Sequence, residues 1–188
     1  FLLEPRLLTT PTIKAETKLL IRREVKQRVH ALAPFLDLRG DPYLVSVPMD
    51  KKNPGYQSKQ SQYWIVEGYT KSTSYPYSSV VEQGDGERYL RNAVKIVVDA
   101  YNGSVHFYIS EPDDPLIEGW ANIFPEMFKP VEDMPAALHE HLRVPVDLFN
   151  VQVNQLQRYH VTEPRKFYSG DDVWQVPIET YGRERVPV

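Results

Sequence analysis

Hydrophobic positions first become regular between residues 17 and 33. Four of them recur at helical spacing, namely Ile21, Val25, Val29 and Leu32. This spacing predicts an α-helix over residues 17–33, and we expect Pro34 to end it because proline cannot continue a helix. Residues 1–16 contain Pro5 and Pro11 and few periodic apolar positions. An extended or irregular lead-in is therefore expected there.

The middle of the chain, from residue 43 to residue 110, is typical of β-strands. Four segments are rich in β-branched and aromatic residues: 43–47, 62–69, 93–101 and 104–110. Loops separate the first three of them, and strands that follow one another in this way predict an antiparallel sheet of about four strands. The loop from Asp50 to Gln62 is long and polar, and its pattern indicates no particular role.

The strongest local signal is the Asn102-Gly103 pair between the last two segments. Asn-Gly favours a two-residue hairpin turn, because both turn positions need a positive φ. Pairing outward from such a turn places Val98 opposite Phe107 on a uniformly apolar face. On the other face, the same register predicts that Asp99 lies directly opposite His106.

After residue 111 the pattern changes to short helices, in a helical part that spans residues 113–170. Each predicted helix has a proline near its start, where the missing N–H of proline would have no partner in any case. These prolines are Pro115, Pro135, Pro145 and Pro164. Strands followed by helices predict the α+β class. At 188 residues, residues 1–188 fit a single soluble domain or domain fragment.

Composition narrows the classes of function. The chain has 22 Lys and Arg against 25 Asp and Glu, for a net charge of −3. A dedicated nucleic-acid-binding domain is normally basic, so no nucleic-acid partner is expected. The sequence has no cysteine, which excludes disulfides, thiol catalysis and cysteine-ligated metals. No stretch approaches the roughly 18 apolar residues of a transmembrane helix.

The two ends of the sequence carry no targeting signal. Residue 1 is Phe, and no charged segment precedes a long apolar stretch as it does in a signal peptide. The last residues, 183–188, have neither a helix cap nor the composition of a tail. We therefore expect the chain to be a segment of a longer protein.

The sequence contains no conventional catalytic or metal-binding motif. It has no phosphate-binding glycine loop and no nucleophile elbow. His139 and His141 lie two residues apart, whereas histidines that share a zinc ion on one helix lie four apart. No metal and no cofactor is therefore expected.

Asp99 and His106 form the one acid–base pair that the predicted hairpin brings together. Such a pair, joined by Glu67, could do the proton transfer of a hydrolase or transferase. The alternative is a cross-strand pair that contributes a few tenths of a kcal/mol to the sheet. We expect the structural role and assign no catalytic residue. A carboxylate beside the imidazole is expected to raise the pKa of His106.

A weak internal repeat extends this face of the sheet. Residues 64–72 and 96–104 share the same order of apolar, acidic, small and aromatic positions. If both segments are strands of one sheet, their acidic and aromatic residues share a face. The predicted binding face then comprises Glu67, Tyr69, Asp99, Tyr101, His106 and Tyr108. We expect a recognition surface if this face is open, and part of the core if the C-terminal helices cover it.

An ordered set of short motifs resembles a known family. The set includes Asp41-Pro42-Tyr43-Leu44, Tyr75-Pro76-Tyr77-Ser78, Tyr89-Leu90-Arg91-Asn92, Asp113-Asp114-Pro115, Phe128-Lys129-Pro130 and Tyr159-His160. On such motifs, from about Leu20 to Pro177, the chain resembles Uncharacterised Protein Family 0182. These are large multi-spanning bacterial membrane proteins with a long soluble region. The loop from Asp50 to Gln62 is longer than the short turn associated with the family.

The resemblance implies a cellular context and no particular activity, since the family has no established one. It implies a soluble region of a multi-pass protein of the bacterial cell membrane, on the outer, extracytoplasmic side. The expected function is to bind a ligand or protein partner of the cell envelope. The remainder of its own membrane-spanning chain is a further expected partner. The alternative is an envelope hydrolase or transferase that uses Asp99, His106 and Glu67.

Overall fold

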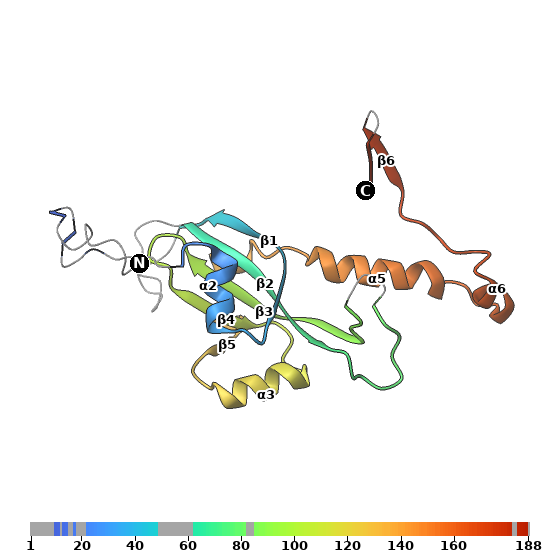
Figure 1. Cartoon of the computed structure of the whole chain (residues 1–188), viewed down its shortest axis with the longest axis horizontal. Helices are drawn as coiled ribbons and strands as arrows, with labels where there is room; N and C mark the ends of the chain where they lie inside the picture. The colour runs from blue at the N-terminus through green and yellow to red at the C-terminus, as the bar shows by residue number, and fades with distance from the viewer. Residues whose placement is uncertain are drawn as a thin grey trace.

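A five-stranded β-sheet lies at the centre of the molecule (Figure 1). In spatial order its strands are β1 (Asp37–Ser46), β2 (Gln62–Ser72), β3 (Tyr89–Asp99), β4 (Val105–Ile109) and β5 (Phe128–Pro130). The first four pair antiparallel, whereas β5 runs parallel to β4. The computed structural model describes residues 22–48, 62–81, 85–181 and 184–187, together with positions 10, 11, 13, 14 and 17.

The predicted α+β class is confirmed, as are the four antiparallel strands in the middle of the chain. Strand β5 makes the sheet a mixed one and is missing from the prediction. The reason is its length: three residues, among them Lys129 and Pro130, carry no strand pattern. Most of the lead-in 1–16 and residues 49–61, which hold most of the long loop, lie outside the described residues.

Two helices cover one face of the sheet, and they are α2 (Val25–Leu32) and α3 (Pro115–Ile123). Val29 of α2 and Ile117 of α3 are fully buried there, in one cluster with Ile96 of β3. Phe35 stacks on Trp120 with ring centroids 4.0 Å apart. This apolar cluster forms the larger core of the molecule.

Helix α2 begins later than predicted, and the expected start at residue 17 is wrong. The carboxylate of Glu24 accepts hydrogen bonds from the backbone N–H groups of Lys26 at 2.9 Å and of Gln27 at 2.5 Å. These N–H groups have no acceptor within the helix, so a side-chain acceptor favours a helix start at this position. The helix ends before Pro34, as predicted.

The opposite face of the sheet is covered by two short helical elements, η1 (Val131–Asp133) and α4 (Ala136–His139). Met134 and Leu138 pack there against Val97 and Tyr108, and Leu138 is fully buried. The central strands therefore have an apolar layer on each side. We call the sheet with α2, α3, η1 and α4 the body.

The hairpin between β3 and β4 departs from the predicted register. His106 lies opposite Val97, so the expected direct pairing of His106 with Asp99 is wrong by two residues. Side chains along a strand alternate with a period of two, so an even shift leaves the faces unchanged. Phe107 accordingly belongs to the core under α2 and α3, as predicted.

The side chain of Asp99 explains the shift. Its Oδ1 accepts the backbone N–H groups of Tyr101 at 2.7 Å and of Asn102 at 2.9 Å, which stabilises a loop wider than two residues. Within this loop, all of which the structure describes, Gly103 alone has a positive φ, of 72°. A two-residue turn would need a positive φ at Asn102 as well. A buried carboxylate therefore sets the pairing.

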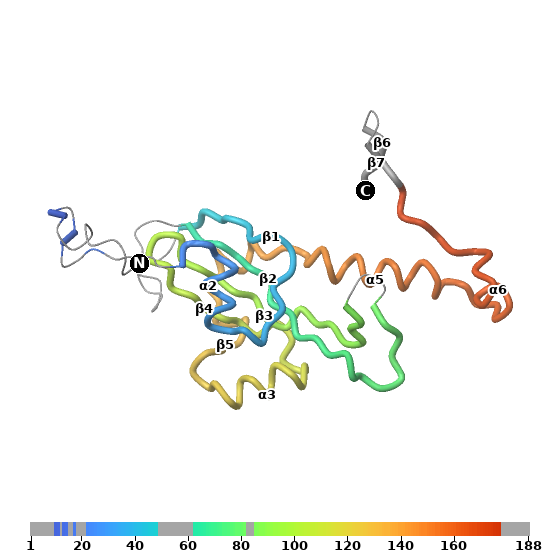
Figure 2. Tube along the Cα trace, in the orientation of Figure 1, coloured from blue at the N-terminus to red at the C-terminus, as the bar shows by residue number. Residues whose placement is uncertain are grey.

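Helix α5 leaves the sheet and extends away from it (Figures 1 and 2). The C-terminal elements are α5 (Val146–Tyr159), α6 (Pro164–Ser169), β6 (Ile178–Tyr181) and β7 (Glu184–Pro187). All four predicted prolines lie at or directly before the first residue of a helix, as expected. We call α5 with α6 the arm. Among the described helices, none is both long enough and apolar enough to cross a membrane.

Candidate ligand-binding groove

The predicted binding face lies mainly inside the body. Four of its members are buried or nearly so: Tyr69, Asp99 and Tyr108, each 1% exposed, and Glu67, with a side chain that is 12% exposed. His106 is half-buried, and Tyr101 is exposed in the hairpin loop. Elements η1 and α4 cover this face, which is the arrangement that we associated with a core. A binding role for the six residues stays a prediction.

The two acidic residues of this face have structural partners. Glu67 accepts a hydrogen bond at 2.5 Å from Nζ of Lys95, which lies opposite it on β3. Asp99 holds the hairpin loop. Lys95 and Asp99 are four residues apart on one strand, so the two carboxylates lie roughly 13 Å apart along it. The structure does not bring Glu67, Asp99 and His106 together as a catalytic group.

Tyr69 connects the sheet to the start of α5. Burial, followed by the nearby carboxylates of Asp147 and Glu67, raises the pKa of Tyr69 to about 12. The phenol therefore stays protonated at neutral pH, and it also accepts a hydrogen bond from the backbone N–H of Leu148. These contacts give Tyr69 a structural role in holding α5 to the body.

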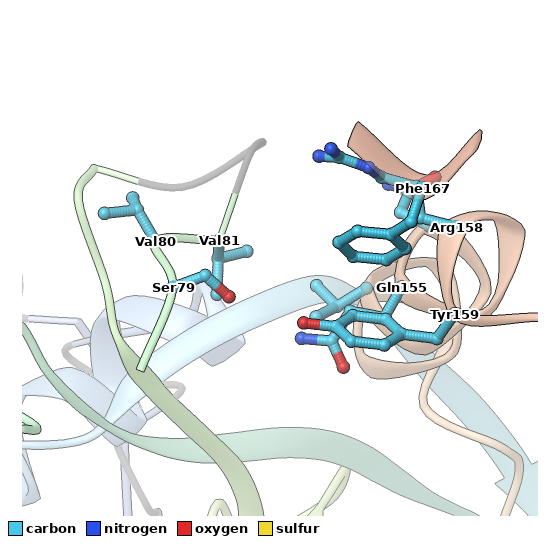
Figure 3. Close-up of a pocket in the computed structure, with 9 residues that line it drawn as sticks. Ser79, Val80, Val81, Gln155, Arg158, Tyr159 and Phe167 are labelled. Atoms are coloured by element: carbon cyan, nitrogen blue, oxygen red, sulfur yellow. The ribbon is translucent and has the colours of Figure 1, made fainter. Parts of the chain in front are cut away.

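A groove lies outside the core, between the β2–β3 loop and helix α5 (Figure 3). One face of α5 forms the first wall, with Leu148, Val151, Gln152, Gln155 and Tyr159. The loop forms the second wall, with Tyr75, Tyr77, Ser78, Ser79 and Val81. Residues 88–91, at the start of β3, join the two walls. The groove thus combines segments that are about 70 residues apart in the sequence.

The outer end of the groove is a mainly apolar cavity of about 250 Å³. Figure 3 shows Val80 and Val81 on the loop side of the cavity and the rings of Tyr159 and Phe167 on the opposite side. These two rings lie 5.6 Å apart. The guanidinium of Arg158 lies 5.7 Å from the centre of the Phe167 ring. Helix α6 therefore completes the cavity by placing Phe167 beside α5.

The inner end of the groove is wider, at about 740 Å³, and more polar. Its lining includes Arg88, Arg91 and the amide of Gln152, together with the rings of Tyr75 and Tyr89. Those two rings stack with centroids 5.2 Å apart. Glu111 is the acidic residue among this described lining. The lining itself thus carries two guanidinium groups against one carboxylate, with the buried carboxylate of Asp114 behind Tyr89.

Tyr89 is fixed in the groove by a buried carboxylate. Asp114, which is 3% exposed, accepts hydrogen bonds from the Tyr89 hydroxyl at 2.9 Å, from the backbone N–H of Leu116 at 2.8 Å, and from the Thr70 hydroxyl. The same carboxylate is the N-cap of α3. Burial, followed by Asp114, raises the pKa of Tyr89 to about 12. The inner end of the groove is therefore anchored to the body.

A network of charged residues holds the base of the β2–β3 loop. Glu87, at the end of the loop, is 2% exposed and contacts Arg39 at 2.7 Å and Lys71 at 3.4 Å. Asp37 contacts the same two residues at 2.7 and 3.2 Å. Burial raises the pKa of both carboxylates, but their hydrogen bonds and the two cations outweigh it and lower the pKa overall.

No pattern in the sequence indicates that these residues form one site. The motif Tyr75-Pro76-Tyr77-Ser78, Arg91 and Tyr159 carried the resemblance to a family, and no binding role followed from them. Strand and helix periodicity describes each segment alone. The groove depends on the direction in which α5 leaves the sheet, which no local pattern specifies.

The described residues contain no group of three or more side chains suited to a metal ion. His139 ends helix α4, and Nδ1 of His141 lies 2.8 Å from the backbone oxygen of Ala137. This geometry gives the two histidines a local role at a helix end.

Comparison with known proteins points to one family. Two cyanobacterial proteins named as UPF0182 proteins align over the whole chain. The one from Parasynechococcus marenigrum is 63% identical over 188 residues, which are 21% of its own length, and the one from Nostoc is 47% identical over 189 residues, or 18% of its length. The chain spans about a fifth of the length of the curated relatives it matches.

No solved structure matches the chain. The model of the uncharacterised protein family UPF0182 matches residues 2–188. The resemblance inferred from short motifs is thereby confirmed. The chain belongs to the uncharacterised protein family UPF0182.

Proposed function

We propose that this chain is the extracytoplasmic, ligand-binding region of a larger multi-pass protein of the bacterial cell membrane, and that it does not catalyse a reaction. The membrane context is the one that the resemblance to this family implies. The relatives are about five times longer than the chain, which leaves room in them for membrane-spanning segments. The groove between the β2–β3 loop and α5 is the proposed binding site.

One observation carries this proposal: the groove is concave, combines apolar and polar walls, and is anchored at both ends. Binding sites are typically clefts with an apolar lining and a few fixed polar groups. Tyr89 is fixed by Asp114 at the inner end, and Phe167 is fixed against Tyr159 at the outer end. Contacts within the chain thus hold both ends of the groove in place.

The outer side of α5 suits a second partner, the remainder of the same polypeptide. Phe149 is 53% exposed and Leu156 is 65% exposed on this side. Ordered apolar side chains that lie in a stripe along a helix usually pack against another element. We propose that a part of the parent chain beyond these 188 residues covers the stripe.

The alternative of an envelope hydrolase or transferase has little geometric support. The carboxylate of Glu67 pairs with Lys95, and that of Asp99 accepts two loop amides. These two carboxylates also lie roughly 13 Å apart along β3, whereas acid–base catalysis needs its groups within hydrogen-bond distance of one substrate. We therefore place function in the groove and not on this sheet face.

The test uses single cysteines in the parent protein, since this region contributes none of its own. Gln155→Cys lies in the groove, and Tyr168→Cys lies outside it, at a residue that is 88% exposed. A maleimide that cannot cross membranes is added to intact cells and, separately, to the purified protein. We expect Tyr168→Cys to react in both samples and Gln155→Cys to react quickly in the purified protein alone, because a ligand protects it in cells.

Two outcomes contradict the proposal. If neither cysteine reacts in intact cells but both react after lysis, the region lies inside the cell. If both react equally in intact cells and in the purified protein, the groove is unoccupied. The parent protein with its other cysteines replaced is the background control.

A further inference from the structure

The apolar end of the groove fits one short alkyl or aryl group. Its cavity of about 250 Å³ is bordered by Val80, Val81 and Val151 and by the rings of Tyr159 and Phe167. A smaller apolar cavity, of about 150 Å³, is enough to bind benzene in another protein. Such lining offers dispersion contacts and displaces water from a nonpolar group. A fully polar ligand would leave this end empty.

The polar end fits an acidic group. Arg88 and Arg91 are both exposed and line it. A guanidinium has five donors and binds carboxylate or phosphate through two parallel hydrogen bonds. Nη1 of Arg88 donates to the backbone oxygen of Ser78, which fixes its position and leaves its other donors available. Arg91 donates to the hydroxyl of Tyr89 and is held in the same way.

The two ends belong to one groove. The residues that border both are Ser79, Val81, Val151, Gln155 and Tyr159. A single molecule can therefore place a nonpolar group at the outer end and a charged group at the inner end. We propose that the ligand is an acidic amphiphile, with one alkyl or aryl tail and a phosphate or carboxylate head. This inference rests on the binding role proposed above.

The backbone beside the polar end of the groove is strained in a way that favours a preformed site. Tyr77 has a φ of 58°, in the left-handed region that residues other than glycine rarely adopt. Strain of this kind persists where the surroundings impose it, and it is concentrated at ligand sites. The Ser78 hydroxyl donates to the backbone oxygen of Tyr75 at 3.1 Å and closes this turn. The turn holds Tyr75 against Tyr89 before any ligand binds.

The test compares three probes that separate the head from the tail. Octyl phosphate carries both, octyl glucoside carries the same tail with a neutral head, and inorganic phosphate carries the head alone. Calorimetry with the 188-residue chain, at probe concentrations below micelle formation, measures each affinity. We expect octyl phosphate to bind at least about tenfold more tightly than either other probe, because hydrogen bonds to charged groups add to burial of the tail.

Matched variants assign the contacts to the groove. Arg91→Gln is expected to weaken octyl phosphate binding about tenfold and to leave octyl glucoside unchanged. Val151→Glu is expected to weaken both. Arg165→Gln removes the same charge from α6, outside the groove, and is expected to change neither. Thermal unfolding of each variant checks that the fold is intact.

Three outcomes overturn the proposal. If octyl phosphate and octyl glucoside bind equally tightly, the acidic head contributes nothing to binding. If inorganic phosphate binds as tightly as octyl phosphate, the tail contributes nothing. If Arg165→Gln lowers the affinity for octyl phosphate as much as Arg91→Gln does, the effect reflects the overall charge of the chain and not a contact in the groove. In all three cases the cysteine experiment can still show an occupied, extracytoplasmic groove, so the proposed function can survive this failure.

Two arms distinguish the source of the amphiphile. Vesicles of phosphatidylglycerol and of phosphatidylcholine are pelleted with the chain, and a Val151→Glu variant serves as the control. Binding to phosphatidylglycerol vesicles alone, lost in the variant, supports a membrane lipid. Binding of dissolved octyl phosphate without vesicle binding supports a free amphiphile, and both results support the shared chemistry.

Discussion

The body and the arm both contain amphipathic helices, but they use them differently. Helix α4 has four residues, and its Leu138 is fully buried against the sheet. Helix α5 has fourteen residues, every one of them described, and none is buried. Its start is tied to the body at Tyr69, whereas Leu156 near its other end is 65% exposed. The longer helix with the clearer apolar stripe is thus the less buried one.

This difference separates two meanings of an apolar stripe. Periodicity shows which side of a helix avoids water, because side chains three and four apart share a face. It does not show what covers that side. In the body the partner is the sheet of the same chain, and the stripe contributes to folding. In the arm one face lines the groove, and the neighbouring stripe is exposed.

The largest expected effect tests this contrast directly. Leu138→Ala removes a fully buried side chain and is expected to lower the free energy of unfolding by about 3 kcal/mol through the lost burial and the cavity left behind. Leu156→Ala makes the same change on the exposed stripe and is expected to change it by less than about 0.5 kcal/mol. Urea unfolding followed by tryptophan fluorescence measures both. Equal losses would show that the arm is part of the core.

The next effect concerns the carboxylate that links body and groove. Asp114→Ala removes an N-cap and two further hydrogen bonds and is expected to destabilise the chain by about 2–3 kcal/mol. Asp113→Ala, at the exposed neighbouring position, is expected to stay within about 0.5 kcal/mol of the original.

A milder variant at the same position gives a spectroscopic readout. Asp114→Asn keeps the size of the side chain but removes the negative charge that helps to raise the pKa of Tyr89 to about 12. Phenolate absorbance should then appear at lower pH for one tyrosine. An unchanged titration would mean that Asp114 does not act on Tyr89.

The smallest expected effect is a dependence of stability on acid pH. The pKa of Glu87 is lower in the folded chain than its ordinary value of 4.5, so the folded state favours the charged form. The resulting stability is fully present above about pH 5 and is lost as the pH falls through the folded pKa. Thermal unfolding from pH 7 to pH 3 should show this loss, and Glu87→Gln should flatten the slope. Glu140→Gln, at an exposed residue, is the control and should leave the slope unchanged.

Several elements could be predicted because the rules behind them act over a few residues. Proline at or directly before the first residue of a helix is one such local conformational preference. The faces of β3 and β4 also followed from a period of two. Strand β5 did not, because a three-residue strand depends on its neighbour β4 for its hydrogen bonds.

The sequence alone therefore determined the class of the fold, the starts of the helices after residue 111 and the sides of β3 and β4 that face the core. Tertiary structure decided the rest. Asp99 stabilises the wider loop, and through it the register of the hairpin, because its carboxylate accepts two backbone N–H groups there. The position of α5 brought Val151 and Gln155 opposite Ser79 and made the groove. Such contacts depend on the sum of many distant interactions, whereas periodicity and turn preferences reflect only neighbouring residues.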